Sequence, residues 1–194
     1  MPVPRLILAS TSPYRRQLLE RLRLPFEAVA PDCDERPLPN ERSAHLVERL
    51  AETKARSVAV GVGDAWVIGS DQVALLDEHV LGKPGDHARA VEQLQACSGR
   101  SVVFCTGLSL VSAADGSAVT EHVDYEVAFR NLTDDEIERY LAAEQPYDCA
   151  GSIRSEGYGI TLFERMAGDD PNALIGLPLI RVAALLRGAG FTLP

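Results

Sequence analysis

The chain has 194 residues and a formal net charge of −9, with 46% apolar and 24% charged residues. These proportions are typical of a globular protein with a substantial core, formed as one domain or as two closely packed lobes. The acidic balance argues against a general nucleic-acid or membrane-surface binder, because both need broad basic patches. It permits a small anionic ligand, and acidic side chains around such a ligand would indicate a divalent metal.

The N-terminal stretch predicts a strand followed at once by a capped helix. Leu6–Ala9 is a short apolar run typical of a buried strand, Ser12 stands at the N-cap and Pro13 at the first helical position. A helix N-terminus after a buried strand suits a phosphate, because free N–H groups and the positive end of the dipole meet there. Arg15 shares the inward stripe of this helix, whereas Arg16 is offset toward the surface. The alternative is a plain β–α unit with a snorkelling arginine.

The remaining elements alternate between helices and strands and then become antiparallel. In chain order we first expect a strand at 26–30, a helix capped by Ser43, a strand at 65–70, a hairpin of 73–76 with 79–81, and a helix that is capped by Asp86 and ends at Gly99. The second half is expected to contain strands at 101–111 and 119–129 joined at Asp115-Gly116, a helix from the Thr133/Glu136 capping box to about Ala143, a strand at 160–164 after a glycine-rich loop, a polar turn at 168–172, and a last helix from Pro178 to about Gly188. This order indicates an α/β protein with a mixed sheet.

The four cysteines, Cys33, Cys97, Cys105 and Cys149, show no CxxC spacing. We therefore expect free thiols in a reducing compartment and no zinc site. The apolar run before Arg15 is too short for a signal peptide, and no run approaches the length of a membrane span. These features predict a cytoplasmic protein.

Several charged side chains occupy positions suited to chemistry. Asp71 follows an apolar run, and α/β enzymes place carboxylates at the carboxyl ends of strands. Glu35 lies in an acidic loop, and Lys54 lies on the apolar stripe of its helix, where it must reach a buried anion or snorkel out. Lys83 precedes a proline, which by itself marks only a turn. Together, cations for phosphate oxygens and carboxylates for metal and water indicate metal-assisted hydrolysis of a phosphoanhydride.

Short motifs in a specific order and spacing cover almost the whole chain. They are Leu8-Ala9-Ser10-x-Ser12-Pro13-x-Arg15, Asp34-Glu35, Lys54, Gly69-Ser70-Asp71, Gly82-Lys83-Pro84, Leu132-Thr133-x-x-Glu136-Ile137, Cys149-Ala150-Gly151 and Gly176-Leu177-Pro178. In these motifs the chain resembles the Maf family of nucleotide pyrophosphatases. The resemblance implies one Maf/Ham1-like α/β domain over residues 1–194. Its mixed twisted sheet is flanked by helices, with two lobes around a deep cleft and no separable linker.

The resemblance also implies an activity and a set of site residues. Family members hydrolyse nucleoside triphosphates to the monophosphate and pyrophosphate with a divalent metal, here expected to be Mg²⁺ or Mn²⁺, and they are often homodimers. Asp71 corresponds to the general base or metal-linked water activator, and Glu35 to its acidic partner at the metal. The residues that correspond to the triphosphate and leaving-group contacts are Ser10, Arg15, Lys54 and Lys83.

Three positions depart from the commoner family pattern of arginine, threonine and glutamine. Here they are Tyr14, Gln72 and Glu156, a triplet similar to that of the subfamily acting on 7-methyl-GTP. Methylation at N7 makes guanine cationic, so an aromatic face attracts the base and an arginine repels it. The carboxylate of Glu156 can accept hydrogen bonds from the guanine N1–H and amino group. The alternative is that Tyr14 packs against the first helix and Glu156 is a solvated loop charge.

We therefore expect a cytoplasmic pyrophosphatase that converts 7-methyl-GTP to 7-methyl-GMP and diphosphate, with a small nucleotide as its partner and neither nucleic acid nor membrane. One alternative is a Maf-type enzyme for dTTP, UTP or a broader range of nucleotides. The other is a nucleotide-binding regulator of cell division that does not hydrolyse its ligand. The presence of both Asp71 and Glu35 argues against the regulator, since pure binding does not need two carboxylates facing a triphosphate.

Overall fold

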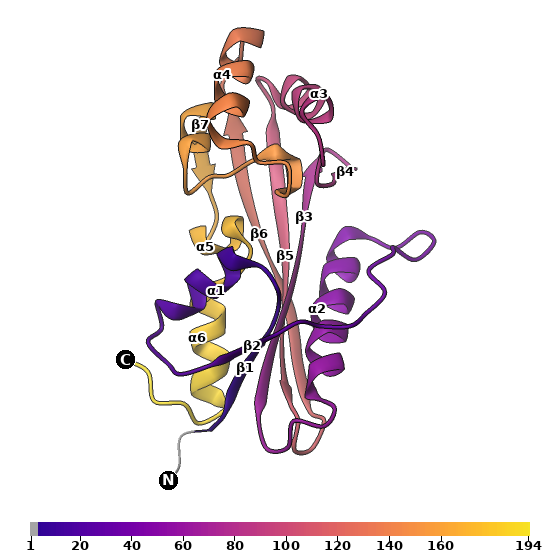
Figure 1. The fold of residues 1–194 in the computed structure, drawn as a ribbon, viewed down its shortest axis with the longest axis vertical. Helices are drawn as coiled ribbons and strands as arrows, with labels where there is room; N and C mark the ends of the chain where they lie inside the picture. Colours follow the sequence, from indigo (N-terminus) through magenta and orange to yellow (C-terminus); the bar gives the residue numbers. More distant parts are fainter. Residues whose placement is uncertain (1–3) are drawn as a thin grey trace. The chain divides into compact units, whose positions relative to one another are not determined.

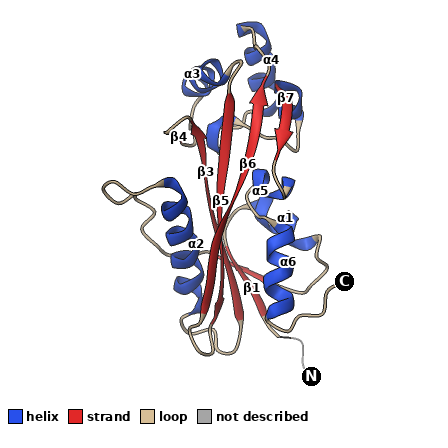
Figure 2. Ribbon diagram, turned by 180° about the vertical axis from the view of Figure 1, so that it is seen from behind, coloured by secondary structure: helices blue, strands red, loops and turns tan. Residues whose placement is uncertain are grey.

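The computed structural model describes residues 4–194, and its strands form one mixed sheet flanked by helices (Figure 1, Figure 2). The strand order is β2 (Glu27–Val29), β1 (Leu6–Ala9), β3 (Trp66–Leu76), β5 (Ser101–Ser112), β6 (Ala118–Phe129) and β7 (Phe163–Ala167), with β4 (His79–Leu81) paired to β3. β1 runs parallel to β2 and β3, whereas β4 and β7 are antiparallel to β3 and β6. The predicted α/β class with a mixed sheet is confirmed.

The chain divides into two compact units. Unit 1 takes in the N-terminal part up to Asp71, together with Thr106–Val123 and Gly176–Pro194. Unit 2 comprises Gln72–Cys105 and Asp124–Ile175. Because β3, β5 and β6 each contribute residues to both units, no single linker joins them. The assignment of the whole chain to one domain with a deep cleft stays a prediction.

In unit 1, helices cover both faces of the sheet. α1 (Pro13–Glu20) and α6 (Leu179–Gly188) lie on one face and α2 (Ser43–Ala59) on the other (Figure 1, Figure 2). The N-terminal prediction is confirmed, since β1 is buried throughout and the Ser12 hydroxyl accepts the N–H of Arg15 at 3.3 Å. The edge strand β2 is shorter than expected and exposed.

The apolar stripe of α2 is buried as predicted, but its cap is not the expected one. The Arg42 carbonyl accepts the Leu46 N–H at 2.9 Å, so Arg42 occupies the N-cap position. Ser43 is therefore already the first residue of the helix, and the prediction that it caps the helix is wrong. No side chain caps α2, so its start depends on backbone bonds and on burial of the stripe.

Two glycines allow α2 to lie unusually close to the sheet. A Cβ atom on Gly69 of β3 would lie 2.0 Å from the Ala51 carbonyl oxygen, and one on Gly107 of β5 would lie 2.1 Å from that of Val47. No side chain fits at such distances, so only glycine permits this contact. The close approach brings the next turn of α2, which carries Lys54, against β3.

Unit 2 contains α3 (His87–Cys97), α4 (Asp134–Glu144), α5 (Pro171–Ile175) and the short 3₁₀ turns η1 (Ala150–Ser152) and η2 (Tyr158–Leu162). The Asp86 carboxylate accepts the Arg89 N–H at 2.9 Å, which confirms the predicted cap of α3. Thr133 and Glu136 form the predicted capping box of α4.

Three predictions in unit 2 are corrected. The strand expected at 160–164 begins only at Phe163, because the preceding residues form η2. The polar turn expected at 168–172 contains the start of α5, where the buried Asp170 carboxylate accepts the Asn172 N–H at 2.9 Å. The helix expected to reach Gly99 ends at Cys97.

The four cysteines are free thiols as predicted, and burial raises the pKa of Cys97 to about 12. Within residues 4–194, the structure contains no helix of the length and apolarity that a bilayer crossing needs.

Candidate active site

Lys54 brings two carboxylates together in unit 1. Its Nζ lies 2.6 Å from Asp71 Oδ1 and 2.9 Å from Glu35 Oε1. The Lys54 side chain is 6% exposed and that of Asp71 is 13% exposed, whereas Glu35 reaches in from a loop with 60% of its side chain exposed. Of the two outcomes expected for Lys54, the structure shows the contact with a buried anion, Asp71.

Asp71 lies within a strand, not after one. β3 runs unbroken from Trp66 to Leu76, so the prediction that Asp71 follows the end of its strand is wrong. The neighbouring strand β1 does end here, because its last pair with β3 is Ala9 with Gly69. Asp71 is thus two residues beyond the carboxyl end of β1. Since alternate side chains share a face, Asp71 projects on the face where Gly69 meets α2, which explains its contact with Lys54.

The other face of this strand holds a link between distant segments. The buried Ser70 hydroxyl lies 2.8 Å from the Gly107 carbonyl and 2.9 Å from the Gly176 carbonyl. Arg15 Nε donates to the same Gly176 carbonyl at 2.8 Å. Gly176 has a φ of 116°, in the region that favours glycine. In the sequence, Gly176 was noted only as part of a family motif. No local signal indicated that its carbonyl orients Arg15.

The charge on Arg15 is influenced by the carboxylates that contact Lys54. Burial lowers the pKa of the Arg15 guanidinium, and the negative charges of Asp71 and Glu35 act in the opposite direction. Arg16 instead faces solvent and pairs with Glu20 at 3.3 Å. The predicted inward and outward directions of the two arginines are confirmed, and Arg15 lies within electrostatic range of the cluster around Lys54.

Ser10 occupies the turn between β1 and α1. It is buried, and its hydroxyl oxygen accepts the Ser12 N–H at 3.1 Å, which shapes the chain as it enters the helix. Tyr14 follows in the first turn of α1 and is half-buried. Both residues thus lie at the helix start where the sequence predicted an anion site.

The loop that carries Glu35 is fastened to α2 by an ion pair. Arg49 Nε and Nη2 donate to the two Glu41 carboxylate oxygens at 2.6 and 2.7 Å. Arg49 Nη2 also donates to the Arg36 carbonyl at 3.2 Å. The hydrogen bonds from Arg49 lower the pKa of Glu41 to about 2. The Arg49 contacts with Glu41 and Arg36 hold the chain in place on the C-terminal side of Glu35.

The remaining predicted site residues belong to unit 2. The Gln72 side-chain amide donates to the Ala173 and Leu174 carbonyls of α5 at 2.7 and 3.2 Å, which orients its nitrogen toward that helix. Lys83 is exposed in the turn after β4. Glu156 lies between η1 and η2, with its Oε1 3.7 Å from Arg154 Nε.

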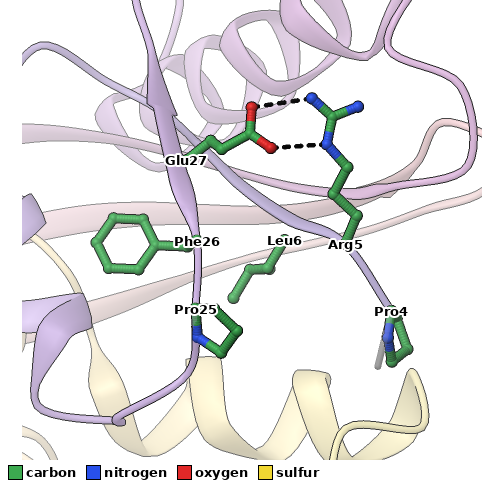
Figure 3. Close-up of a pocket in the computed structure, with 6 residues that line it drawn as sticks. All are labelled: Pro4, Arg5, Leu6, Pro25, Phe26 and Glu27. Carbon is green, nitrogen blue, oxygen red and sulfur yellow. Dashed lines mark hydrogen bonds and ion pairs between the residues drawn. The ribbon is translucent and has the colours of Figure 1, made fainter. Parts of the chain in front are cut away.

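A separate hollow of about 320 Å³ lies in unit 1 at the start of β1 and β2 (Figure 3). Its charged residues, Arg5 and Glu27, form a bidentate ion pair at 2.8 and 2.9 Å. None of the predicted site residues lines it; its lining residues are Pro4, Arg5, Leu6, Pro25, Phe26 and Glu27. With its two charges paired to each other and the rest of its lining apolar, this hollow does not suit a triphosphate.

The cluster around Lys54 contains carboxylate donors of the kind that divalent cations bind. Asp71 and Glu35 both direct a carboxylate oxygen at one ammonium, so the two carboxylates face a common point. Carboxylate oxygens are the ligands that Mg²⁺ and Mn²⁺ prefer. The donor set therefore fits such a cation.

Comparisons with known proteins place the chain in a family. The family model described as Maf-like protein matches residues 5–189, and the chain belongs to that family. A relative named 7-methyl-GTP pyrophosphatase, from Nitrosococcus oceani, is 58% identical over 188 residues, covering 97% of this chain and 94% of its own. A relative of the same name from Aromatoleum aromaticum is 54% identical over the full length of both chains. A solved nucleoside-triphosphatase, or dITP/XTP pyrophosphatase, from Mycobacterium abscessus is 19% identical with a TM-score of 0.48, covering 96% of this chain and 95% of its own.

Proposed function

We propose that this chain is a pyrophosphatase that hydrolyses 7-methyl-GTP to 7-methyl-GMP and diphosphate. The observation that carries the proposal is the contact of Lys54 with both Asp71 and Glu35, with Arg15 within range of their charges. Buried cations matched to carboxylates suit a reaction in which a highly charged phosphate chain is held while water attacks it. The names of relatives that share more than half of the aligned residues supply the substrate.

In the proposed mechanism, Asp71 accepts the proton of the attacking water at a carboxylate oxygen. Lys54, in contact with Asp71 at 2.6 Å, orients this carboxylate and supplies positive charge to the phosphates. The residues proposed to contact the triphosphate and leaving group, on the family resemblance, are Ser10, Arg15, Lys54 and Lys83. When bound by Asp71 and Glu35, Mg²⁺ or Mn²⁺ would neutralise phosphate charge and make the water more acidic.

Tyr14, Gln72 and Glu156 are proposed to select the base. An aromatic ring attracts the cationic 7-methylguanine, and a carboxylate accepts hydrogen bonds from the base edge. The anchoring of the Gln72 amide on α5 supports this role, because an oriented amide discriminates better than a mobile one. We also propose a cytoplasmic location, on the free thiols, and a homodimer, on the family resemblance.

The test is quantification of both products from 7-methyl-GTP with Mg²⁺ or Mn²⁺, for the wild type and Asp71→Asn. We expect equal amounts of 7-methyl-GMP and diphosphate, and a kcat at least about 100-fold lower in Asp71→Asn, as for loss of a general base. Asp77→Asn is the matched control, because Asp77 pairs with Arg100 in unit 2 and belongs to no proposed site. Unchanged turnover in Asp71→Asn would remove Asp71 from the mechanism. Tight nucleotide binding without diphosphate release would favour the regulator instead.

A further inference from the structure

Glu144 of α4 forms hydrogen bonds with the loop that carries Glu156. Its Oε1 accepts the backbone N–H of Tyr158 at 2.5 Å, and its Oε2 accepts a longer hydrogen bond from Arg154 Nη1 at 3.4 Å. These contacts fall two residues before and two residues after Glu156. The Glu144 side chain is only 15% exposed, so solvent replaces these contacts poorly. The Glu144 carboxylate therefore holds the chain in place on both sides of Glu156.

Arg154 lies between two carboxylates. Besides the contact with Glu144, its Nε lies 3.7 Å from Glu156 Oε1. Its backbone N–H donates to the hydroxyl of the buried Tyr140 at 3.0 Å, and that hydroxyl donates to the Ser152 carbonyl at 3.1 Å. Because the Arg154 guanidinium contacts both carboxylates, its positive charge is divided between Glu144 and Glu156 and only partly neutralises Glu156. Glu156 thus keeps negative potential that a cationic base can use.

The position of Glu144 is unfavourable for the helix itself. It is the last residue of α4, where a carboxylate faces the negative end of the helix dipole. It also lies close to Gly157, where an added Cβ atom would lie 2.6 Å from Glu144 Oε1 and would displace this carboxylate. A carboxylate that opposes the helix dipole is explained by the loop that it holds.

We propose that Glu144 is a positioning residue for base selection, acting through Arg154 and the Tyr158 N–H to orient the Glu156 carboxylate toward a cationic purine. The inference rests on the proposed function and adds to it a residue that does not contact the base. Without the Glu144 charge, Arg154 pairs fully with Glu156 and its positive charge opposes the methylated base.

The test compares kcat/KM for 7-methyl-GTP with that for GTP in the wild type and in Glu144→Gln. This variant keeps the size of the side chain and an oxygen for the Tyr158 N–H, but removes the charge. We expect the ratio to fall about tenfold through a higher KM for 7-methyl-GTP, with kcat retained. The Glu156 carboxylate is still present to bind the base, but it is less well oriented. Glu138→Gln is the matched control, because Glu138 is on the same helix, exposed and paired with His87.

A double-mutant cycle with Glu156→Gln separates positioning from a general structural effect. If Glu144 acts through Glu156, the double variant has the ratio of Glu156→Gln alone. A folded Glu144→Gln enzyme with the wild-type ratio overturns the proposal. If Glu144→Gln does not fold, Gly157→Ala displaces the same carboxylate without removing it, and a folded Gly157→Ala enzyme with the wild-type ratio overturns the proposal equally. A wild type that does not prefer 7-methyl-GTP over GTP refutes the proposed function instead.

Discussion

Replacing Lys54 by methionine tests the arrangement at the centre of unit 1. The substitution keeps an unbranched apolar stem against the core and removes the ammonium that contacts Asp71 at 2.6 Å and Glu35 at 2.9 Å. Asp71, with 13% of its side chain exposed, then loses its charged donor in a place where water replaces it poorly. Glu35, at 60% exposure, is resolvated easily.

The magnitude follows from this difference in exposure. Breaking a buried ion pair by removing one partner costs about 3–5 kcal/mol, and the exposed half of this pairing contributes little. Because Asp71 keeps some exposure, we expect Lys54→Met to lower the free energy of unfolding by about 3 kcal/mol, at the low end of this range. Activity should fall by about 100- to 1000-fold in kcat, comparable to removal of one preorganised electrostatic donor.

Urea unfolding of a double-mutant cycle measures the pairing. The four proteins are the wild type, Lys54→Met, Asp71→Asn and the double variant, and we expect a coupling energy above about 1 kcal/mol because the neutral pair leaves no isolated charge. Arg56→Met on the same helix is the control, since its exposed pair with Glu52 is worth less than about 0.5 kcal/mol. A Lys54→Met protein as stable as the Arg56→Met protein, with no coupling to Asp71, would refute the reasoning.

Two further predictions concern how the site is held. Gly69→Ala should lower the thermal unfolding midpoint sharply or prevent folding, because its Cβ would lie 2.0 Å from the Ala51 carbonyl; overpacking of this kind costs about 1–3 kcal/mol or more. Gly188→Ala, with open space around the new Cβ, is the control, and equal midpoints for the two would contradict the close contact of α2 with β3. For Glu41, the folded pKa of about 2 lies below its ordinary 4.5, so its pair with Arg49 stabilises the fold above pH 4.5 and this stabilisation is lost as the pH falls toward 2. The difference in unfolding midpoint between wild type and Glu41→Gln should therefore shrink between those pH values, and a constant difference would contradict the assigned ion pair.

Local signals predicted much of the fold. The apolar run of β1, the Ser12 cap and the Thr133/Glu136 capping box each depend on residues within a few positions of one another, and each is present. The errors fall where tertiary contacts decide. The strand predicted at 65–70 ended before Asp71, yet β3 continues to Leu76, where its last residues pair with β4. Gly69 marks close packing against α2, not the end of the strand.

The site itself was predictable only in part. The helical period placed Arg15 and Lys54 on inward faces, but it did not identify their partners. The Lys54 contact with Asp71 depends on how α2 docks, and the Arg15 contact with the Gly176 carbonyl joins residues 161 positions apart. Such links follow from the packed fold and have no signal in sequence spacing. The family motifs named the residues without indicating these contacts.

The central claim, selectivity for a methylated purine, is tested most directly by kcat/KM for diphosphate release from 7-methyl-GTP, GTP, UTP and dTTP under one set of conditions. The proposed function predicts that 7-methyl-GTP has the highest value. It also predicts that a variant carrying Tyr14→Arg, Gln72→Thr and Glu156→Gln shifts the preference toward UTP and dTTP. A wild-type kcat/KM for UTP or dTTP equal to or above that for 7-methyl-GTP would contradict the assigned substrate.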